Sequence, residues 1–346
     1  MSRLRVVQWA TGNIGLRSLR GVLGHPGLEL VGVHVYDPGK VGRDAGELAG
    51  VDPIGVAATG TLDDVLALAP DCVLYMPRAC DLDDVCALLS AGVDVVTTRG
   101  EFHRPASMEP AVRERVEAAC AAGGASIHST GSSPGFITEA LPLVLTSIQR
   151  RLDRVLIEEF ADLSQRPSPE LLFDIMGFGR EPTEVGEGRL DHGRTSFGPS
   201  LALLADALGT PLDEIDSSGE MAVARQRTEI AAGTIEAGMT AAQRTTVTGA
   251  HDGRPLVQFR ATWYCTTDLD ADWELGATGW RVTVDGDAPL TVALPFPFPI
   301  EEMAERSPGY TANRAVNAVP TVCSAPPGIR TTVDLPQVIA RFGSGS

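Results

Sequence analysis

The sequence is poor in positive charge, and it has no long hydrophobic run. Its 28 lysine and arginine residues face 45 aspartate and glutamate residues, which gives a formal net charge of −17 at pH 7. Because no basic stripe offsets this excess, nucleic acid and anionic membranes are excluded as main partners. No apolar run reaches membrane-spanning length, and Arg3 and Arg5 interrupt the N-terminus before a secretory signal could form. The sequence therefore predicts a cytoplasmic location.

Several catalytic and metal-binding motifs are also missing. The six cysteines include no C-x-x-C pair, which predicts buried thiols and no metal site. There is no G-x-S-x-G, H-E-x-x-H or G-K-[ST] motif, so the hydrolase and kinase classes lose support. His103, His128 and His192 are possible acid–base groups, but none stands in a triad pattern or at metal-ligand spacing.

What the chain does have is a dinucleotide fingerprint at its start. Residues 4–9 form a short apolar strand pattern, and a helix begins at about Asn13. The turn between them reads Ala10-x-Gly12-x-x-Gly15, which is the fingerprint with alanine in place of the first glycine. Strand, turn and helix in this order bring free N–H groups and a helix dipole to a pyrophosphate. The predicted cofactor contacts here are Ala10, Thr11, Gly12, Asn13 and Ile14.

Strand and helix patterns alternate through the first third of the chain. The predicted strands after residues 4–9 are 28–36, 54–58, 72–76, 93–98 and 125–129. The predicted helices are 13–24, 62–69 (capped by Thr61), 82–90, 110–122 and, leaving this layer, 138–151. Continuous apolar strands separated by amphipathic helices predict a parallel sheet covered on both faces, an α/β Rossmann domain.

Longer strands follow, at 154–161, 244–250, 256–265, 280–284 and 290–294. Hairpin signals at 252–253 and 285–286 favour antiparallel pairing, and helices are expected at 168–177 and 200–208, with a polar loop around 191–192. A helix is expected over 310–319 and an extended segment over 320–327. We predict a dinucleotide-binding domain at 1–137, with the tail 310–346 packed back on it, and an α+β substrate and dimerisation domain at 138–309 with an open, mostly antiparallel sheet.

The loop after the second strand carries two competing signals about the cofactor. Asp37, which follows Tyr36, is placed to accept bonds from a free ribose 2′-hydroxyl and would favour NAD. Lys40 or Arg43 is placed to pair with a 2′-phosphate and would favour NADP. The sequence does not decide whether the cofactor is NADP(H) or NAD(H).

Ligands of open α/β sheets bind at the carboxyl ends of the strands. Glu101 stands three residues past an apolar strand, where its carboxylate can hold an ammonium or iminium group and transfer protons; the alternative is an exposed loop glutamate. The other residues at these strand ends that we predict to contact the cofactor are Met76, Pro77, Arg78, Thr98, Pro134 and Gly135.

Longer stretches resemble one family. They are Val6–Gly15, Lys40–Gly50, Val95-Val-Thr-Thr-x-x-Glu101, Gly131-x-x-Pro-Gly-Phe136 and Val316-Asn-Ala-Val-Pro320. In this order they are similar to the native amine dehydrogenases and 2,4-diaminopentanoate dehydrogenases, whose N-terminal domain is dihydrodipicolinate-reductase-like. The stretch 168–179 resembles mycobacterial-type members. The Lys-x-Asp-x-Pro-Ser-Gly-Thr-Ala motif and the His-His pair of true dihydrodipicolinate reductases are missing.

The resemblance implies NAD(P)-dependent oxidative deamination of an amine, or reductive amination of a ketone or aldehyde with ammonia, in a homodimer. It makes Glu101 the match to the catalytic glutamate. Many members carry two adjacent acids there, whereas this chain has Gly100-Glu101. It also adds Asn317 as a predicted cofactor contact. The predicted wall of the substrate pocket consists of Phe136, Phe173, Met176, Phe178 and His192.

Two other functions remain open for a chain with this sequence. One is an NAD(P)H-dependent imine or carbonyl reductase that needs no free ammonia. The other is a non-catalytic dinucleotide-binding regulator whose second domain serves as a protein interface.

Overall fold

The computed structural model describes residues 3–342. The chain forms two compact units. One consists of residues 3–136 together with 306–342, and the other of residues 137–305. The chain therefore leaves the first unit after Phe136 and returns to it at Arg306.

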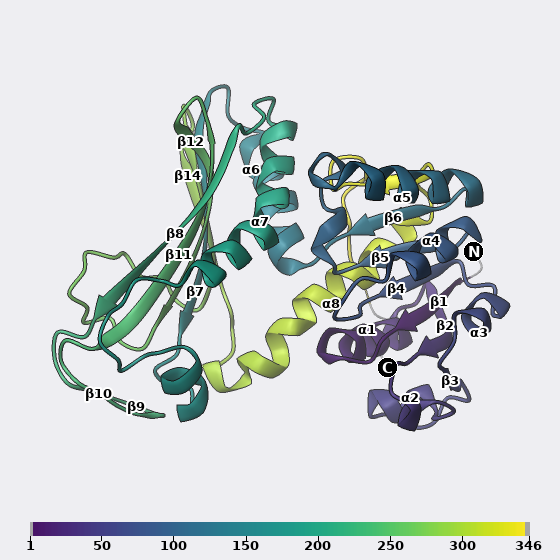
Figure 1. Cartoon of the computed structure of the whole chain (residues 1–346), viewed down its shortest axis with the longest axis horizontal. Helices are drawn as coiled ribbons and strands as arrows, with labels where there is room; N and C mark the ends of the chain where they lie inside the picture. The colour runs from purple at the N-terminus through teal and green to yellow at the C-terminus, as the bar shows by residue number, and fades with distance from the viewer. Residues whose placement is uncertain (1–2, 343–346) are drawn as a thin grey trace. The chain divides into compact units, whose positions relative to one another are not determined.

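The first unit contains a seven-stranded parallel sheet in the order β3-β2-β1-β4-β5-β6-β15 (Figure 1). The order of its first six strands is that of a Rossmann sheet, which places the topological switch point between β1 and β4. The strands are β1 (Leu4–Trp9), β2 (Leu28–His34), β3 (Ala58–Thr59), β4 (Cys72–Tyr75), β5 (Asp94–Thr97), β6 (Ser126–Ser129) and β15 (Gly328–Arg330).

Helices cover both faces of this sheet, as predicted. Val6 faces a core that includes Leu19 of α1 and Val316 of α8, while its neighbour Val7 faces a core with Leu88 of α4 and Val116 of α5. This alternation is expected for a strand buried on both sides. The helices are α1 (Asn13–Gly24), α2 (Ala45–Ala49), α3 (Leu62–Ala67), α4 (Leu82–Ser90), α5 (Pro110–Gly123) and α8 (Met303–Val322). Thr61 caps α3 by accepting a hydrogen bond from Asp64 N.

The second unit is built on a six-stranded mixed sheet in the order β14-β13-β7-β12-β11-β8. Its neighbours pair antiparallel except β7 and β12, which are parallel. The α/β plus α+β fold class is thus confirmed. The strands are β7 (Leu152–Asp162), β8 (Glu214–Val223), β11 (Thr240–His251), β12 (Arg254–Tyr264), β13 (Gly279–Gly286) and β14 (Leu290–Pro295), with a separate hairpin of β9 (Thr228–Ile230) and β10 (Gly233–Ile235).

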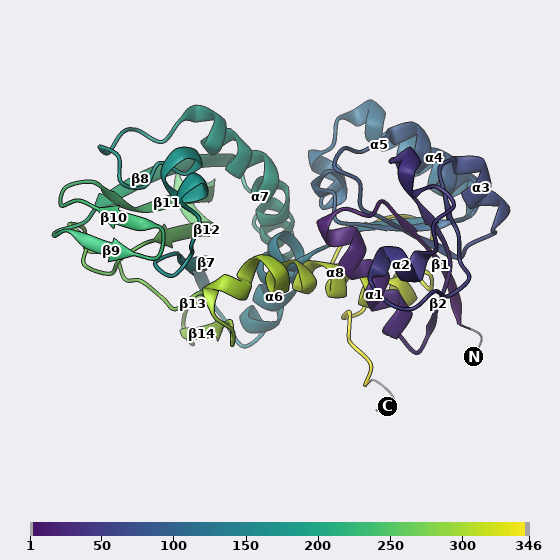
Figure 2. The same ribbon diagram turned by 90° about the horizontal axis from the view of Figure 1, so that it is seen from below.

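The prediction of a polar loop around residues 191–192 is wrong, because these residues lie in the long helix α7 (Glu187–Ala207). Its glycines and Pro199 are typical of a loop in sequence. In the structure Gly193 faces Val247 of β11 and Gly198 faces Ile215 of β8, and a β-carbon on either glycine would lie at an ordinary contact distance of 3.4 Å from the nearest methyl carbon. Figure 2 shows α7 beside the strands of this unit.

Other predicted boundaries also need correction. The strand expected at 54–58 is only Ala58–Thr59, and the strand expected at 28–36 ends at His34. The helix expected at 138–151 is regular only in α6 (Leu141–Thr146), since β7 begins at Leu152. The helix expected at 168–177 is a short irregular one at Glu170–Ile175. The segment expected to be extended at 320–327 begins as the last turn of α8, which ends at Val322, and β15 follows at Gly328.

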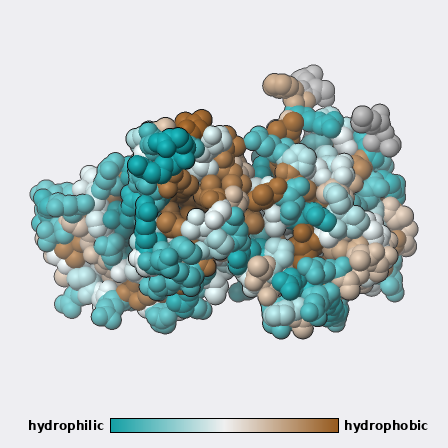
Figure 3. Space-filling view, turned by 90° about the horizontal axis from the view of Figure 1, so that it is seen from above, coloured by the Kyte–Doolittle hydropathy of each residue, from teal (hydrophilic) through white to brown (hydrophobic). Residues whose placement is uncertain are grey.

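Much of the face in Figure 3 is hydrophilic, with hydrophobic residues gathered in smaller patches. No helix within residues 3–342 has both the length and the apolarity that crossing a membrane requires. Cys72, Cys86, Cys120 and Cys265 are buried thiols. In the same range, no group of three or more His, Cys, Asp or Glu side chains is arranged to hold a metal ion.

Candidate functional site: a dinucleotide cradle and a strand-end carboxylate

The turn after β1 has the shape that a pyrophosphate requires. Ala10 has a φ of 72°, the left-handed region in which alanine costs about 1 kcal/mol or more and glycine does not. A β-carbon on Gly15 would lie 2.2 Å from Ala10 O, so only glycine lets α1 approach the turn. A β-carbon on Gly12, in contrast, would have no atom within 4 Å. The space in front of Gly12 is therefore open to a phosphate group.

The hydrogen bonds of the turn leave the start of α1 available to a ligand. Gln8 is fully buried, and its Nε2 donates hydrogen bonds of 3.1 Å to the carbonyl oxygens of both Trp9 and Ala10. These bonds hold the backbone of the turn in place. Gly12 is the N-cap of α1 and has no side chain to cap it. The first-turn N–H groups and the helix dipole can therefore receive an anion. Ala10 and Thr11 are buried, whereas Gly12 and Asn13 are exposed, and Ile14 is half-buried.

Lys40, on the loop after β2, reaches this turn. Its Nζ donates a hydrogen bond to Thr11 Oγ1 at 3.1 Å, so a cation stands beside the cradle. Asp37 instead caps its own turn, with Oδ1 accepting from Gly39 N at 2.9 Å. Arg43 lies 4.0 Å from Glu47 in an exposed ion pair. Of the two predicted cations, the structure brings Lys40 to the cradle and pairs Arg43 with a carboxylate.

An aromatic cluster supports the same edge of the sheet. The Trp9 ring stacks on His34 at a centroid distance of 3.8 Å, and Trp9 Nε1 donates to the Tyr36 hydroxyl at 2.9 Å. Burial lowers the pKa of His34 and raises the pKa of Tyr36. Both side chains are therefore neutral at pH 7, and Tyr36, 57% exposed, presents one side to solvent.

Glu101 lies in the short 3-10 helix Gly100–Phe102, and Arg99, the residue before this helix, is anchored to the strand ends. Thr97 Oγ1 donates to Tyr75 O at 2.6 Å and accepts from Arg99 N at 3.1 Å, and Ser129 Oγ donates to Arg99 O. Arg99 Nη2 donates to Glu101 Oε1 at 2.5 Å, and its Nη1 donates to Arg78 O. The Glu101 side chain is 42% exposed. Arg99 was not predicted as the partner of this carboxylate, although its position two residues before Glu101 was a signal.

A cysteine and two histidines also lie near these strand ends. Burial, and secondarily the charge of Glu101, raises the pKa of Cys80 to about 11, so this thiol stays protonated at neutral pH. His103 and His128 are buried, and His128 Nδ1 lies 2.7 Å from Arg330 O. Glu101, unlike these side chains, is exposed.

The remaining predicted cofactor contacts fall at strand ends or on α8. Met76 and Pro77 follow β4 and are buried, Arg78 is exposed, and Thr98 is half-buried. Pro134 and Gly135 lie where the backbone of the segment Ser132–Ala140 is not helical, and Ser132 joins this segment to α8 through a 2.7 Å hydrogen bond between its Oγ and Thr311 Oγ1. Asn317 is half-buried on α8.

The residues predicted to line a substrate pocket are spread over both units. Phe136 is half-buried at the end of the first unit. In the second unit, Phe173 and Met176 are half-buried, Phe178 is fully buried in the core, and His192 is exposed on α7. Met176 also lines a pocket of about 530 Å³, together with the start of α7.

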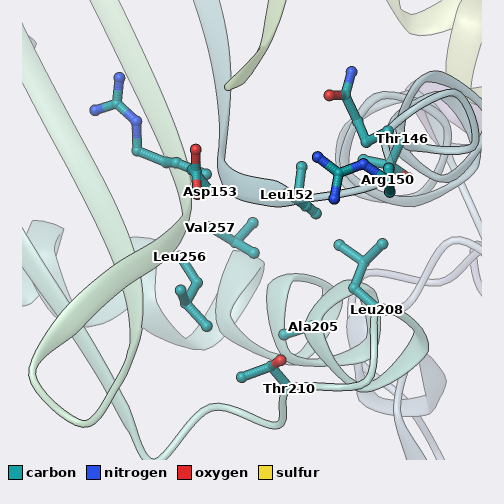
Figure 4. Close-up of a pocket in the computed structure, with 11 residues that line it drawn as sticks. Thr146, Arg150, Leu152, Asp153, Ala205, Leu208, Thr210, Leu256 and Val257 are labelled. Carbon is teal, nitrogen blue, oxygen red and sulfur yellow. The ribbon is translucent and has the colours of Figure 1, made fainter. Parts of the chain in front are cut away.

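A separate pocket of about 340 Å³ lies between the end of α6, the end of α7 and the start of β12. Figure 4 shows Leu152, Leu208 and Val257 pointing into it, with Arg150 and Asp153 at its edge. The charges around it are paired with one another. Arg150 lies 3.0 Å from Asp287, Arg154 lies 2.9 Å from Asp285, and Asp153 lies 3.1 Å from Arg151.

The parallel sheet with its glycine turn and the mixed sheet of the second unit together define a dihydrodipicolinate-reductase-like dehydrogenase fold. A family profile, the 2,4-diaminopentanoate dehydrogenase C-terminal domain, matches residues 136–345. An amine dehydrogenase of Streptomyces virginiae is 30% identical over 98% of this chain and 99% of its own length. A 2,4-diaminopentanoate dehydrogenase of Acetoanaerobium sticklandii is 24% identical over 99% of this chain and 96% of its own length.

The solved structure of an amine dehydrogenase from Mycobacterium smegmatis has the same fold. It superimposes with a TM-score of 0.69 at 21% identity and covers 98% of both chains. The protein described here belongs to the family of amine dehydrogenases and 2,4-diaminopentanoate dehydrogenases. The resemblance stated from its sequence motifs is confirmed.

Proposed function

We propose that the protein is an NAD(P)-dependent amine dehydrogenase. In the reductive direction, a ketone or aldehyde, ammonia, NAD(P)H and a proton give an amine, NAD(P)+ and water; the oxidative direction is the reverse. The observation that carries the proposal is Glu101, which accepts a hydrogen bond from Arg99 at the carboxyl edge of a sheet whose first turn is a dinucleotide cradle; Thr97 and Ser129 hold the backbone of Arg99. The whole-length likeness to an amine dehydrogenase supports the same conclusion.

The open space at Gly12, the uncapped start of α1 and the cation of Lys40 fit a nicotinamide dinucleotide. In this proposal the N–H groups of Asn13 and Ile14 receive the pyrophosphate, and Tyr36, Asp37 and Lys40 surround the adenosine ribose. The cofactor supplies or accepts the hydride. The protein's own contribution to the rate is to position the reactants and to stabilise charge.

Glu101 is the proposed binding and proton-transfer group for ammonia. Its carboxylate oxygens hold ammonium and take a proton from it, and the same proton then assists loss of water from the carbinolamine. Oε1 is bonded to Arg99 in the structure. Ammonium must therefore share the carboxylate with this guanidinium or displace it. The positive charge of Arg99 also disfavours a second cation, which makes the affinity for ammonium weaker than that of an isolated carboxylate.

The contacts of Lys40 favour NADP over NAD. Lys40 Nζ and Thr11 Oγ1 together offer a 2′-phosphate an ammonium group and a hydroxyl, while Asp37 Oδ1 already accepts a hydrogen bond from Gly39 N. A charge-assisted hydrogen bond contributes about 1.5–3 kcal/mol. Lys40→Met is therefore expected to weaken NADPH binding about tenfold or more, and NADH binding less than twofold, in fluorescence titrations. If Asp37 governs the choice, Lys40→Met leaves both affinities unchanged and Asp37→Ala weakens NADH binding.

We also propose that the protein is a homodimer through its second unit, as the family resemblance implies. The proposed partners are therefore a small amine or carbonyl compound, ammonia and a second copy of the chain. Of the residues predicted to form the pocket wall, we keep Phe173 and Met176 of the second unit, because Phe178 is fully buried in the core.

The activity is tested by following NADPH and NADH oxidation at about pH 9 over a panel of small ketones and aldehydes, with and without ammonium. Oxidation that requires both the carbonyl compound and ammonium supports the proposal. Oxidation that is independent of ammonium would indicate a carbonyl or imine reductase. Dinucleotide binding without turnover over the whole panel would indicate a regulator.

A further inference from the structure

Arg99 ties together the ends of three neighbouring strands in the first unit. Its backbone N–H donates a hydrogen bond of 3.1 Å to Thr97 Oγ1 at the end of β5, and its carbonyl oxygen accepts one from Ser129 Oγ at the end of β6. Its side chain reaches the segment after β4, where Nη1 donates to Arg78 O at 2.6 Å. The backbone and the guanidinium of Arg99 are therefore both fixed at the carboxyl edge of the sheet.

The same guanidinium holds one oxygen of Glu101. Arg99 Nη2 donates to Glu101 Oε1 at 2.5 Å, whereas no hydrogen bond to Oε2 is formed within residues 3–342. Arg99 Nε is buried, and Nη1 is already bonded to Arg78 O. The guanidinium therefore cannot leave Oε1 without losing a second hydrogen bond. The two oxygens of this carboxylate are unequal, because Oε1 is held and Oε2 is available.

This arrangement has two opposite consequences for a cation that binds Glu101. A guanidinium presents its N–H donors in a rigid planar fork, so it orients the carboxylate that it contacts, and a misplacement of about 1 Å in a reacting group can lower a rate about a hundredfold. The positive charge of Arg99 also repels a second cation. Water screens this repulsion in part, because the side chains of Arg99 and Glu101 are 30% and 42% exposed.

We propose that Arg99 is a positioning residue that acts through Glu101. It holds Oε1 so that Oε2 binds ammonium and takes one proton from it, which leaves ammonia to attack the carbonyl carbon. Ammonium shares the carboxylate with Arg99 and does not displace it. The inference rests on the proposed function and deepens it, since it assigns the two carboxylate oxygens different tasks. Arg99 thereby raises both kcat and the KM for ammonium.

The test begins with Arg99→Met in the full-length protein, which keeps an apolar stem and removes the fork and the charge. Steady-state rates are measured at saturating NADPH and carbonyl compound while ammonium is varied. We expect kcat to fall by about ten- to a hundredfold because Glu101 loses its orientation. We expect the KM for ammonium to fall by about three- to tenfold because a partly screened repulsion is removed. A residue with only a structural role would not lower this KM.

Arg99→Lys separates the charge from the fork. Lysine keeps the positive charge but cannot bridge Arg78 O and Glu101, so the KM for ammonium is expected to stay within about twofold of wild type while kcat remains at least about fivefold lower. The matched control is Arg113→Met. Arg113 is a half-buried arginine of α5 that lies 3.9 Å from Glu117, and its Nε is also buried. Its replacement is expected to leave both constants within about twofold.

A double variant tests whether Arg99 acts through Glu101. In the Glu101→Gln background, Arg99→Met is expected to change kcat less than about twofold, because the carboxylate that Arg99 orients is gone. An effect as large as in the wild-type background would overturn the proposal. An unchanged kcat in Arg99→Met, or a raised KM for ammonium at an unchanged melting temperature, would also overturn it.

The wild-type protein decides the proposed function separately. If its NADPH oxidation requires ammonium and Arg99→Met leaves both constants unchanged, the dehydrogenase is retained and only the role of Arg99 is rejected. If its NADPH oxidation is absent or independent of ammonium over the whole carbonyl panel, the dehydrogenase and the role of Arg99 are rejected together.

Discussion

Replacement of Glu101 by glutamine is expected to lower kcat for reductive amination by about 100- to 10,000-fold, the range contributed by a positioned general acid–base group. Glutamine keeps the size of the side chain and can still accept the hydrogen bond from Arg99. It cannot take up a proton from ammonium at neutral pH. Because the dinucleotide cradle is untouched, the dissociation constant of NADPH should change less than twofold. Steady-state rates at saturating ammonium, together with a cofactor titration, measure the two effects.

Glu109 provides the matched control for this substitution. It caps α5 by accepting a hydrogen bond from Val112 N at 3.0 Å, and it is exposed. Glu109→Gln makes the same chemical change at a structural carboxylate and is expected to leave kcat within about twofold. If Glu101→Gln keeps more than a tenth of the wild-type kcat, the proton-transfer role proposed for Glu101 is wrong.

Two glycines of the first turn should respond to substitution in opposite ways. A side chain at Gly12 enters open space, so Gly12→Asp is expected to leave the melting temperature unchanged. Its carboxylate would occupy the pyrophosphate position, and such a like-charge contact costs several kcal/mol, which is at least about a hundredfold in NADPH affinity. In Gly15→Ala the new methyl group would lie 2.2 Å from Ala10 O. Overpacking of this kind costs about 1–3 kcal/mol, so the melting temperature should fall by several degrees.

The melting temperature and the dissociation constant of NADPH are measured for both variants. If the pyrophosphate binds at Gly12, Gly12→Asp must lose NADPH binding and keep its melting temperature. Gly15→Ala must have a lower melting temperature. Tight NADPH binding by Gly12→Asp would show that the pyrophosphate lies elsewhere.

The first unit could be predicted almost completely from its sequence because its signals are local. The strand at Leu4–Trp9 and the helix at Asn13–Gly24 follow from an apolar run, a small-residue turn and an amphipathic pattern, and both have the predicted bounds. The strand β8 was missed because it combines exposed polar residues with little alternation. The start of α7 was missed because Gly188, Gly193 and Gly198 indicate a loop by propensity.

The residues of the candidate site could be predicted from the sequence, but the hydrogen bonds between their side chains could not. The position of Glu101 after an apolar strand and the position of Lys40 after β2 could be read from the order of elements. The hydrogen bond of Lys40 to Thr11 and that of Arg99 to Glu101 depend on the directions of side chains in loops. The periodic pattern of a sequence carries no information about these directions.

The return of the chain at Arg306 sets the order in which the two units can be completed on the ribosome. Ala315 and Val319 of α8 fill part of the core beneath β1, and β15 pairs with β6, to which it is also tied by a 2.9 Å hydrogen bond between Ser126 Oγ and Pro326 O. The nucleotide-binding unit begins first and closes last, after the whole intervening unit has left the exit tunnel. A nascent chain arrested before residue 303 would carry a complete glycine turn on a sheet with an uncovered face. Completion of the core beneath β1 therefore waits for the synthesis of α8.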